Sequence, residues 1–356
     1  MRASLISLTT GSASSSSKRI AARSSSRRII HFSQASFVPY RKPVSSSVLN
    51  QRAAPLQTIC QQRQKHTAAS PSPPEHKVPI DMAYDLVQPK DVTAKGQSLV
   101  ICHGLFGSKQ NWRSLAKLFA SKLGMPIYTL DLRNHGTSPH AEPHTYSAMA
   151  EDISYFLKKH NLTSGVNLMG HSMGGKSVMA FALNDKLNKP LRSLISVDMS
   201  PAIGKISAEF ASYTESMMEI EKSRVKTKHE ADQILAKIEP SLPTRQFLLT
   251  NTRQTHGEDP HLVFRIPLPL LSSSIPDIGD FPYTPPPPIS STSPQWNGPT
   301  LFLKGSQSKY INRKNIPVAE AFFPKMKLEI LETGHWVHAE KPNETVELVK
   351  KFIESV

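Results

Sequence analysis

The segment Gly170-His171-Ser172-Met173-Gly174 places a serine between two glycines, a G-x-S-x-G pattern that can present a nucleophile. An apolar run precedes this segment and a helical pattern follows it, so Ser172 is expected on a sharp strand-to-helix turn. Small neighbours relieve crowding in such a turn, and the N-terminus of the following helix stabilises negative charge. The pattern and its context therefore predict that Ser172 attacks an acyl carbon.

A serine hydroxyl is a weak nucleophile at neutral pH and needs a neighbouring base, which is usually a histidine. The chain has 14 histidines, so position must identify the base. His335 follows the last expected strand, and the chain order nucleophile, acid, histidine requires a late histidine. His338 is the nearest rival but would point away from His335 on an extended segment, while His171 lies in the turn itself and would brace neighbouring loops. We therefore predict His335 as the base.

The carboxylate that orients this histidine is less obvious. Its commonest place is the loop after the penultimate strand, but residues 305–309 contain no carboxylate, and Ser308 cannot serve. The loop after the preceding strand contains Asp198 and ends at the same edge of the sheet, so we predict Asp198 as the acid. Asp277 and Asp280 are weaker alternatives, and the other interpretation of Asp198 is a loop-capping carboxylate.

An acyl-transfer reaction also needs donors directed at the developing oxyanion. We expect the backbone N–H of Leu105, in the glycine-flanked loop 103–108 with Phe106 as its neighbour, to act together with the N–H of Met173. The scattered histidines have no cysteine or carboxylate at ligand spacing, so neither a metal nor another cofactor is predicted.

The polar segment 131–138 (DLRNHGTS) follows another apolar run and resembles a second active site. We favour a structural role for it, in which Asp131 and Arg133 hold loops near the pocket. Cys102 precedes the turn at His103 inside an apolar run and is interpreted as buried packing.

Apolar runs alternate with helical periodicity from residue 78 onward, which predicts βαβ units and an α/β fold with a mostly parallel sheet. The expected strands are 98–102, 127–132, 165–169, 194–198, 300–304 and 327–331. The expected helices lie near 112–119, at 146–160, after Ser172 and at 343–353.

The alternation stops between residues 201 and 265, where helical periodicity predicts a helical insertion. Phe210, Tyr213, Met217 and Ile220 would share one face, and the insertion would serve as a lid over a pocket or as a packed subdomain. Residues 267–299 contain ten prolines and are expected to form a surface loop without helix or internal strand.

The net charge of +15 suggests nucleic acid as a partner until its position is considered. Eleven of the 43 Lys and Arg residues lie in 1–74, where there is no acid; the remainder holds 32 bases against 28 acids, a net charge of +4. An acid-free leader rich in Arg and Ser is typical of an organellar transit peptide, so we predict a mitochondrial address in 1–74, with the matrix as destination, and a folded domain in 75–356. A plastid address and simple disorder are the alternatives for 1–74. Nucleic-acid binding is not expected, and no window reaches the length of a transmembrane span. Cys60 lies in the leader, which leaves Cys102 without a disulfide partner.

Five motifs in order, HGLFGS, DLRNHGTS, GHSMGG, VDMSP and TGHWVHAEKP, resemble one branch of the α/β-hydrolase superfamily. The chain is similar over about residues 78–356, except in the proline-rich loop, to the mitochondrial abhydrolase domain-containing protein 11 group, to bacterial esterases and to yeast mitochondrial ethanol acetyltransferases. The resemblance implies the α/β-hydrolase fold and, in this branch, a triad acid after the strand that follows the nucleophile, which also favours Asp198. It further implies ester hydrolysis and, for the yeast members, acetyl transfer from acetyl-CoA to ethanol.

Three functions therefore stay open at this point. The chain is expected to be a serine hydrolase of short acyl esters or thioesters, including acyl-CoA, with water or a small alcohol as acceptor. The alternatives are a plain carboxylesterase or thioesterase without transferase activity, and a catalytically idle binding protein with a hydrolase fold. The presence of a nucleophile, a base, an acid and an oxyanion loop disfavours the idle protein.

Overall fold

The structure is a computed structural model that describes residues 79–204, 207–285 and 294–356. The expected leader, residues 1–74, lies outside the described residues. Part of the proline-rich segment, residues 286–293, lies outside them as well.

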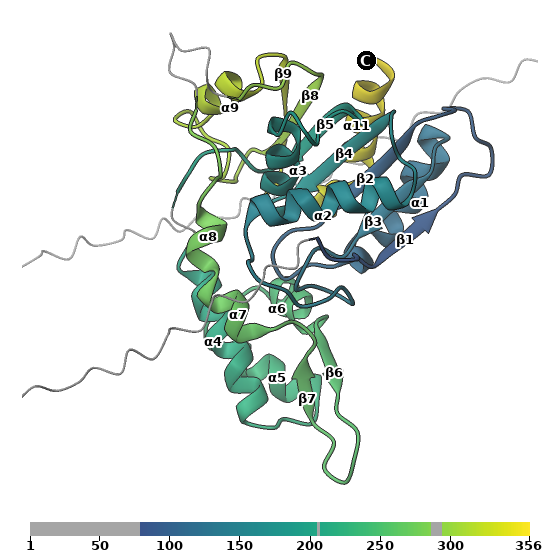
Figure 1. Cartoon of the computed structure of the whole chain (residues 1–356). Helices are drawn as coiled ribbons and strands as arrows, with labels where there is room; N and C mark the ends of the chain where they lie inside the picture. The colour runs from purple at the N-terminus through teal and green to yellow at the C-terminus, as the bar shows by residue number, and fades with distance from the viewer. Residues whose placement is uncertain (1–78, 205–206, 286–293) are drawn as a thin grey trace, which may run out of the picture. The chain divides into compact units, whose positions relative to one another are not determined.

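A seven-stranded sheet forms the centre of the described domain, with strand order β1-β3-β2-β4-β5-β8-β9 (Figure 1). Every neighbouring pair is parallel except β1 and β3, so the expectation of a mostly parallel sheet is confirmed. The strands are β1 (Tyr84–Val87), β2 (Ser98–Cys102), β3 (Ile127–Leu130), β4 (Val166–His171), β5 (Leu191–Val197), β8 (Thr300–Gly305) and β9 (Met326–Leu331). The antiparallel edge strand β1 was not predicted.

Helices cover both faces of this sheet, and the strand residues alternate between the two layers. Leu99 of β2 packs in a cluster with residues of α1 (Arg113–Leu123) and α11 (Pro342–Glu354). The next residue, Val100, belongs to the opposite cluster with residues of α2 (Tyr146–Lys159) and α3 (Met173–Leu183). Burial on both faces explains why the central strands are continuous apolar runs, and Cys102 is fully buried as expected.

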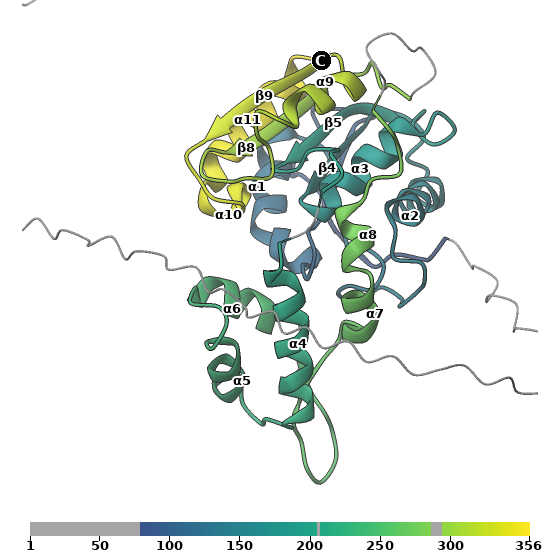
Figure 2. The ribbon, with the colours of Figure 1, turned by 90° about the vertical axis from the view of Figure 1, so that its left-hand side faces the viewer.

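The chain leaves the sheet after β5 and returns to it at β8, and most of the connection forms an insertion (Figure 2). Its helices are α4 (Glu209–Lys222), α5 (Lys228–Leu235), α6 (Leu242–Leu249), α7 (Leu268–Ser273) and α8 (Ile275–Gly279). Tyr213, Met217 and Ile220 of α4 are buried, as the predicted periodicity requires. The purely helical description of 201–265 is wrong in one respect, because β6 (Thr252–Gln254) and β7 (Leu262–Phe264) form an antiparallel hairpin.

The expectation that 267–299 contains no helix is also wrong, since α7 and α8 lie within it. Both helices have a proline in the first turn, at Pro269 and Pro276. The first helical N–H groups have no intrahelical acceptor, so proline loses nothing there and its fixed φ suits the helix. A high proline content therefore limits helix length without preventing the start of a helix.

Three short helices complete the described part of the chain. They are η1 (Lys109–Trp112), α9 (Ile316–Phe322) and α10 (Val337–Glu340). None of the helices in the described residues is long and apolar enough to cross a bilayer.

Candidate active site

Ser172 lies between β4 and α3 with φ 54° and ψ −119°, a strained conformation for a residue that is not glycine. The surroundings enforce this turn through two glycines. A Cβ on Gly170 would lie 2.2 Å from the carbonyl oxygen of Gly174, and a Cβ on Gly174 would lie 2.5 Å from that of Cys102. The glycines therefore allow the helix to approach the strands closely, and the turn directs the Ser172 side chain into the site.

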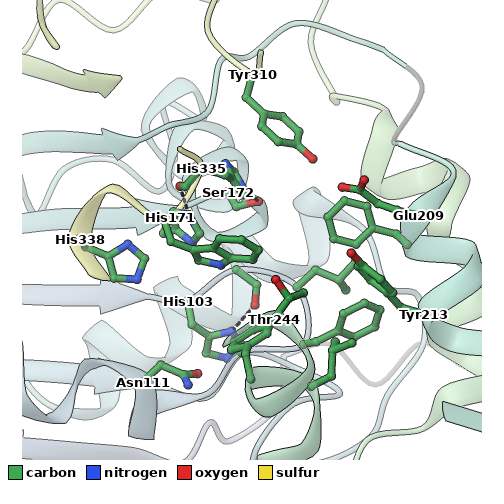
Figure 3. A pocket seen from close by; sticks show the side chains of 18 of the residues that line it. His103, Asn111, His171, Ser172, Glu209, Tyr213, Thr244, Tyr310, His335 and His338 are labelled. Atoms are coloured by element: carbon green, nitrogen blue, oxygen red, sulfur yellow. Dashed lines mark hydrogen bonds between the residues drawn. The ribbon is translucent and has the colours of Figure 1, made fainter. Parts of the chain in front are cut away.

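Ser172, His335 and Asp198 form one hydrogen-bonded chain. The Ser172 Oγ lies 3.0 Å from Nε2 of His335, and Nδ1 of His335 lies 2.7 Å from Oδ2 of Asp198. Figure 3 shows His335 beside Ser172 at the wall of a pocket. The three side chains come from the ends of β4 and β5 and from the loop after β9, so the carboxyl edge of the parallel sheet brings them together.

Asp198 is fully buried and its carboxylate has three donors. The N–H of Gly305 donates to Oδ1 at 3.0 Å, and the hydroxyl of Ser308 and Nδ1 of His335 both face Oδ2. The sequence excluded Ser308 as the acid but did not reveal its contact with Asp198. The contact arises because β5 and β8 are neighbours in the sheet, which places the two loops that follow them beside each other.

The rival acids lie elsewhere. Asp277 belongs to α8, and Asp280 follows it, where its backbone oxygen accepts a hydrogen bond of 2.8 Å from Nζ of Lys176. In the described residues, the carboxylate bonded to Nδ1 of His335 is that of Asp198.

The two rival histidines brace the site. His171 Nε2 lies 3.0 Å from the backbone oxygen of His335, which agrees with the expected bracing role. His338 does not lie on an extended segment, contrary to expectation, because it belongs to α10; its ring stacks on Trp112 at 4.1 Å between centroids. Burial and the neighbouring His335 lower the pKa of His338 to about 3.

Tyr310 packs against His335, with ring centroids 4.2 Å apart. Burial, with the negative charges of Glu209 and Asp198, raises the pKa of Tyr310 to about 12. The phenol is therefore neutral at physiological pH. Its ring limits the movement of the imidazole, a contact that the sequence did not reveal.

The expected oxyanion donors lie in the loop before η1, at Leu105, and at the first residue of α3, Met173. The N–H groups of Leu105 and Met173 have no hydrogen-bond acceptor among the described residues, so both are free for a ligand. The N–H of Phe106, by contrast, donates to Nε2 of His135 at 3.1 Å. Leu105 and Met173 therefore remain the available pair near Ser172.

The segment 131–138 is structural, as expected. Asp131 accepts hydrogen bonds from the N–H groups of Lys109 and Thr137, at 2.7 and 2.8 Å. Arg133 and Asp152 form a fully buried pair in which two guanidinium nitrogens contact two carboxylate oxygens. These pairs fix the loops that surround the candidate site.

Two cavities open beside Ser172. The first has a volume of about 140 Å³ and is largely aromatic. Among the described residues that line it, the carboxylate is that of Glu209, and Figure 3 shows this side chain across the pocket from Ser172. The aromatic residues lining it are Phe106, Trp112, Phe210, Tyr213, Phe247, Tyr310 and Trp336.

The second cavity has a volume of about 470 Å³ and also touches Ser172 and Met173. Its lining contains Lys176, Lys309 and Lys314 and, within the described residues, no carboxylate side chain. Burial lowers the pKa of Lys176 to about 8, and its ammonium donates to the backbone oxygens of Gly279 and Asp280. The two cavities thus differ in charge: the smaller contains an acid and the larger contains bases.

No group of three or more His, Cys, Asp or Glu side chains arranged to hold a metal ion occurs in the part of the chain that the structure describes. The hydrogen-bonded series Ser172, His335 and Asp198 has the side chains that nucleophilic acyl transfer needs.

Comparisons with known proteins agree with this geometry. Residues 97–342 match the alpha/beta hydrolase fold family. The sn-1-specific diacylglycerol lipase ABHD11 of Xenopus tropicalis is 38% identical over 78% of this chain and 83% of its own, and a probable alcohol acetyltransferase of Saccharomyces cerevisiae is 36% identical over 79% and 85%. A solved marine microorganism esterase is 31% identical, with a TM-score of 0.66 over 77% of this chain and 100% of its own. The chain therefore belongs to the α/β-hydrolase family, in the branch that holds the ABHD11 lipases and the yeast alcohol acetyltransferases.

Proposed function

We propose that Ser172 is the nucleophile, His335 the general base and Asp198 the orienting acid of an acyl-transfer reaction on short-chain esters or thioesters. The observation that carries this proposal is the continuous relay from Ser172 Oγ through both ring nitrogens of His335 to Oδ2 of Asp198, at 3.0 and 2.7 Å. A relay of this geometry activates a serine because the base is held in one orientation and the correct tautomer.

In the first half of the reaction, Ser172 Oγ forms a bond to the acyl carbon as its proton passes to Nε2 of His335. The bond to the leaving oxygen or sulfur then breaks, and the leaving group takes that proton. In the second half, water or an alcohol attacks the acyl-serine, gives its proton to His335, and releases Ser172 with the proton returned. Asp198 keeps the imidazolium oriented and stabilised through both halves.

The negative charge that forms on the acyl oxygen in each half is stabilised by the N–H groups of Leu105 and Met173. Both are unengaged within the described residues, and Met173 begins α3, whose N-terminus favours negative charge. No side chain has to move to create these donors.

The two cavities support a division of the substrate between them. The aromatic cavity of about 140 Å³ suits a short apolar acyl chain, and Glu209 in its wall disfavours an anion. The larger cavity, with three lysines and no acid among its described lining, suits the leaving group or the acceptor, including a leaving group with negative charge. This arrangement favours a short acyl group on an ester or thioester.

The acceptor decides between a plain esterase and an alcohol acetyltransferase, the activity in the name of the yeast relative. The acyl-serine is common to both, and the aromatic walls beside it favour a small alcohol over bulk water as they exclude solvent. We therefore propose hydrolysis with alcohol as a competing acceptor.

A fluorophosphonate and a product analysis test this proposal. The reagent should label wild type and Asp277→Asn, the matched control, but not Ser172→Ala. With acetyl-CoA as donor, rising ethanol should divert product from acetate to ethyl acetate. Labelling without ethyl acetate at any ethanol concentration leaves a plain esterase or thioesterase, and absence of labelling in wild type removes Ser172 as the nucleophile.

We further propose that the reaction takes place in the mitochondrion, in the matrix. The support is the composition of residues 1–74, with eleven basic residues and no acid before Glu75. Import of a full-length chain carrying a C-terminal fluorescent protein, compared with a chain that starts at residue 75, tests this location.

A further inference from the structure

The peptide groups around Phe106, next to the candidate oxyanion donor Leu105, are held from two sides. Phe106 has φ 60°, a left-handed conformation that costs a bulky residue free energy and persists only when the surroundings enforce it. Its ring is buried, so the strain is not relieved by turning the side chain into solvent. The contacts that hold this residue therefore determine where the neighbouring N–H of Leu105 points.

The first contact comes from the segment 131–138. The Phe106 N–H donates to Nε2 of His135 at 3.1 Å, while Nδ1 of His135 lies 2.9 Å from the backbone oxygen of Arg133. Burial, with nearby His103 and His144, holds the pKa of His135 well below its usual range. The ring is therefore neutral, with Nδ1 protonated and Nε2 free to accept. This contact anchors the loop to the segment 131–138.

The second contact comes from the insertion. Nδ2 of Asn251 donates to the backbone oxygen of Phe106 at 2.7 Å, a contact between residues 145 positions apart in the sequence. Asn251 lies between α6 and β6, two residues after the end of α6, and is 2% exposed. Its own backbone oxygen accepts from the N–H of Arg265 at 2.9 Å, so the Asn251 main chain is fixed within the insertion.

Asn251 therefore joins the insertion to the loop that carries an oxyanion donor. The ring of Phe106 also lies 6.2 Å from that of Phe210, just inside α4, so the insertion meets this residue through both its backbone and its side chain. If the insertion moves away, the Phe106 carbonyl loses its donor and the strained residue is free to relax.

We propose that Asn251 is a positioning residue, through which the geometry of the oxyanion hole depends on contact between the insertion and the loop 103–108. It touches no substrate; it holds the Phe106 backbone so that the Leu105 N–H points at the acyl oxygen. This inference rests on the proposed acyl-transfer function. Its consequence is that the second donor, Met173 at the start of α3, is independent of the insertion, whereas Leu105 is not.

The test compares Asn251→Ala with Thr252→Val, a matched control at the next position. Thr252 is also buried, and its hydroxyl donates to the backbone oxygen of Leu249 at 2.7 Å, so its replacement removes one buried hydrogen bond inside the insertion without touching Phe106. We expect Asn251→Ala to lower kcat by about 10- to 100-fold with little change in KM, somewhat less than the roughly 10²–10³-fold loss of a whole oxyanion donor. Thr252→Val should keep kcat within about twofold of wild type.

A transition-state analogue separates positioning from general destabilisation. A trifluoromethyl ketone forms an oxyanion on Ser172, so its Ki should rise in Asn251→Ala by the same factor as kcat/KM falls, but not in Thr252→Val. Equal kcat and Ki in the two variants would overturn the proposal.

Asn251→Asp provides a second route should the alanine variant fold poorly. Its ionised carboxylate cannot donate to Phe106, but the protonated acid can, so kcat relative to wild type should rise as the pH is lowered. A pH-independent ratio near one would also overturn the proposal. If wild type itself is neither labelled by a fluorophosphonate nor active on esters, the proposed function fails, and this inference fails with it.

Discussion

Replacing Asp198 with asparagine tests the relay at its most unusual position. The carboxylate accepts from Gly305 and Ser308 as well as from His335, and all three donors point at it. An asparagine keeps the size and can still accept at one oxygen. However, its amide group brings two hydrogens to the side that faces His335, so the imidazole can bond to it only by presenting an unprotonated Nδ1.

The expected loss of turnover follows from this change of the His335 tautomer. With Nδ1 unprotonated, Nε2 carries the proton and points it at Ser172, so the ring cannot act as a base. Turnover should fall by about 10⁴, the loss typical of a triad acid, which corresponds to about 5 kcal/mol in the activation barrier. Ser308→Ala removes one donor but leaves the carboxylate and the tautomer intact, so its loss should be about 10-fold, in line with one hydrogen bond to a charged group.

The assay is kcat for a short p-nitrophenyl ester, with circular dichroism to show that each variant is folded and with Asp280→Asn as the matched control. Asp280→Asn should retain near wild-type turnover, because its side chain does not contact His335 in the described structure. A folded Asp198→Asn enzyme within tenfold of wild type, or a larger loss in Asp280→Asn, would refute the assignment of the acid.

Three further predictions concern the leader, the turn at Gly174 and the buried His338. The mature protein should begin after about residue 70, and N-terminal sequencing of protein from isolated mitochondria would contradict this if the chain still began near Met1. Gly174→Ala should destabilise the fold by about 1–3 kcal/mol in urea unfolding, because its Cβ would lie 2.5 Å from the oxygen of Cys102, whereas Gly204→Ala has open space and should be neutral. Stability should fall between pH 6.5 and pH 3, because His338 is neutral in the fold with a pKa of about 3 and the unfolded chain takes up its proton below about 6.5. At pH 5 this histidine contributes about 2 kcal/mol of the loss. The drop in the free energy of unfolding from pH 7 to pH 5 should therefore be smaller by that amount in His338→Gln than in wild type. An equal drop in both proteins would contradict the low pKa of His338.

Long periodic segments were predictable from the sequence because their pattern reflects burial. The strand 98–102 and the helix 146–160 agree with β2 and α2 to within a residue, since an unbroken apolar run is typical of a buried strand and a 3.6-residue period is typical of an amphipathic helix. Short elements were not predicted, because they show too little of a pattern. The edge strand β1 and the hairpin strands β6 and β7 have three or four residues each, too few to show a period, and their pairing depends on distant partners.

The site residues also divide into those with a local sequence pattern and those that depend on distant parts of the chain. Ser172 carries a local signal, because its turn needs glycines at fixed positions. His335 and Asp198 were inferred from their places after strands. Ser308 and Asn251 carry no local signal, since a serine or an asparagine in a loop has many roles, and only the folded chain brings them to Asp198 and Phe106.

The contact between Ser308 and Asp198 means that two neighbouring strand ends share a single carboxylate position. His335 needs a carboxylate oxygen within hydrogen-bond distance of its Nδ1, and a carboxylate at either strand end could supply that oxygen. An exchange that moves the acid from one strand to the other, Asp198→Ser combined with Ser308→Asp, therefore passes through singly changed proteins that have either no carboxylate or two in the same space. The two carboxylates of the Ser308→Asp intermediate would repel each other, and one would hold a proton. Both singly changed proteins are therefore expected to turn over more slowly than the unchanged enzyme, so the acid cannot move from one strand end to the other by single substitutions without a loss of activity.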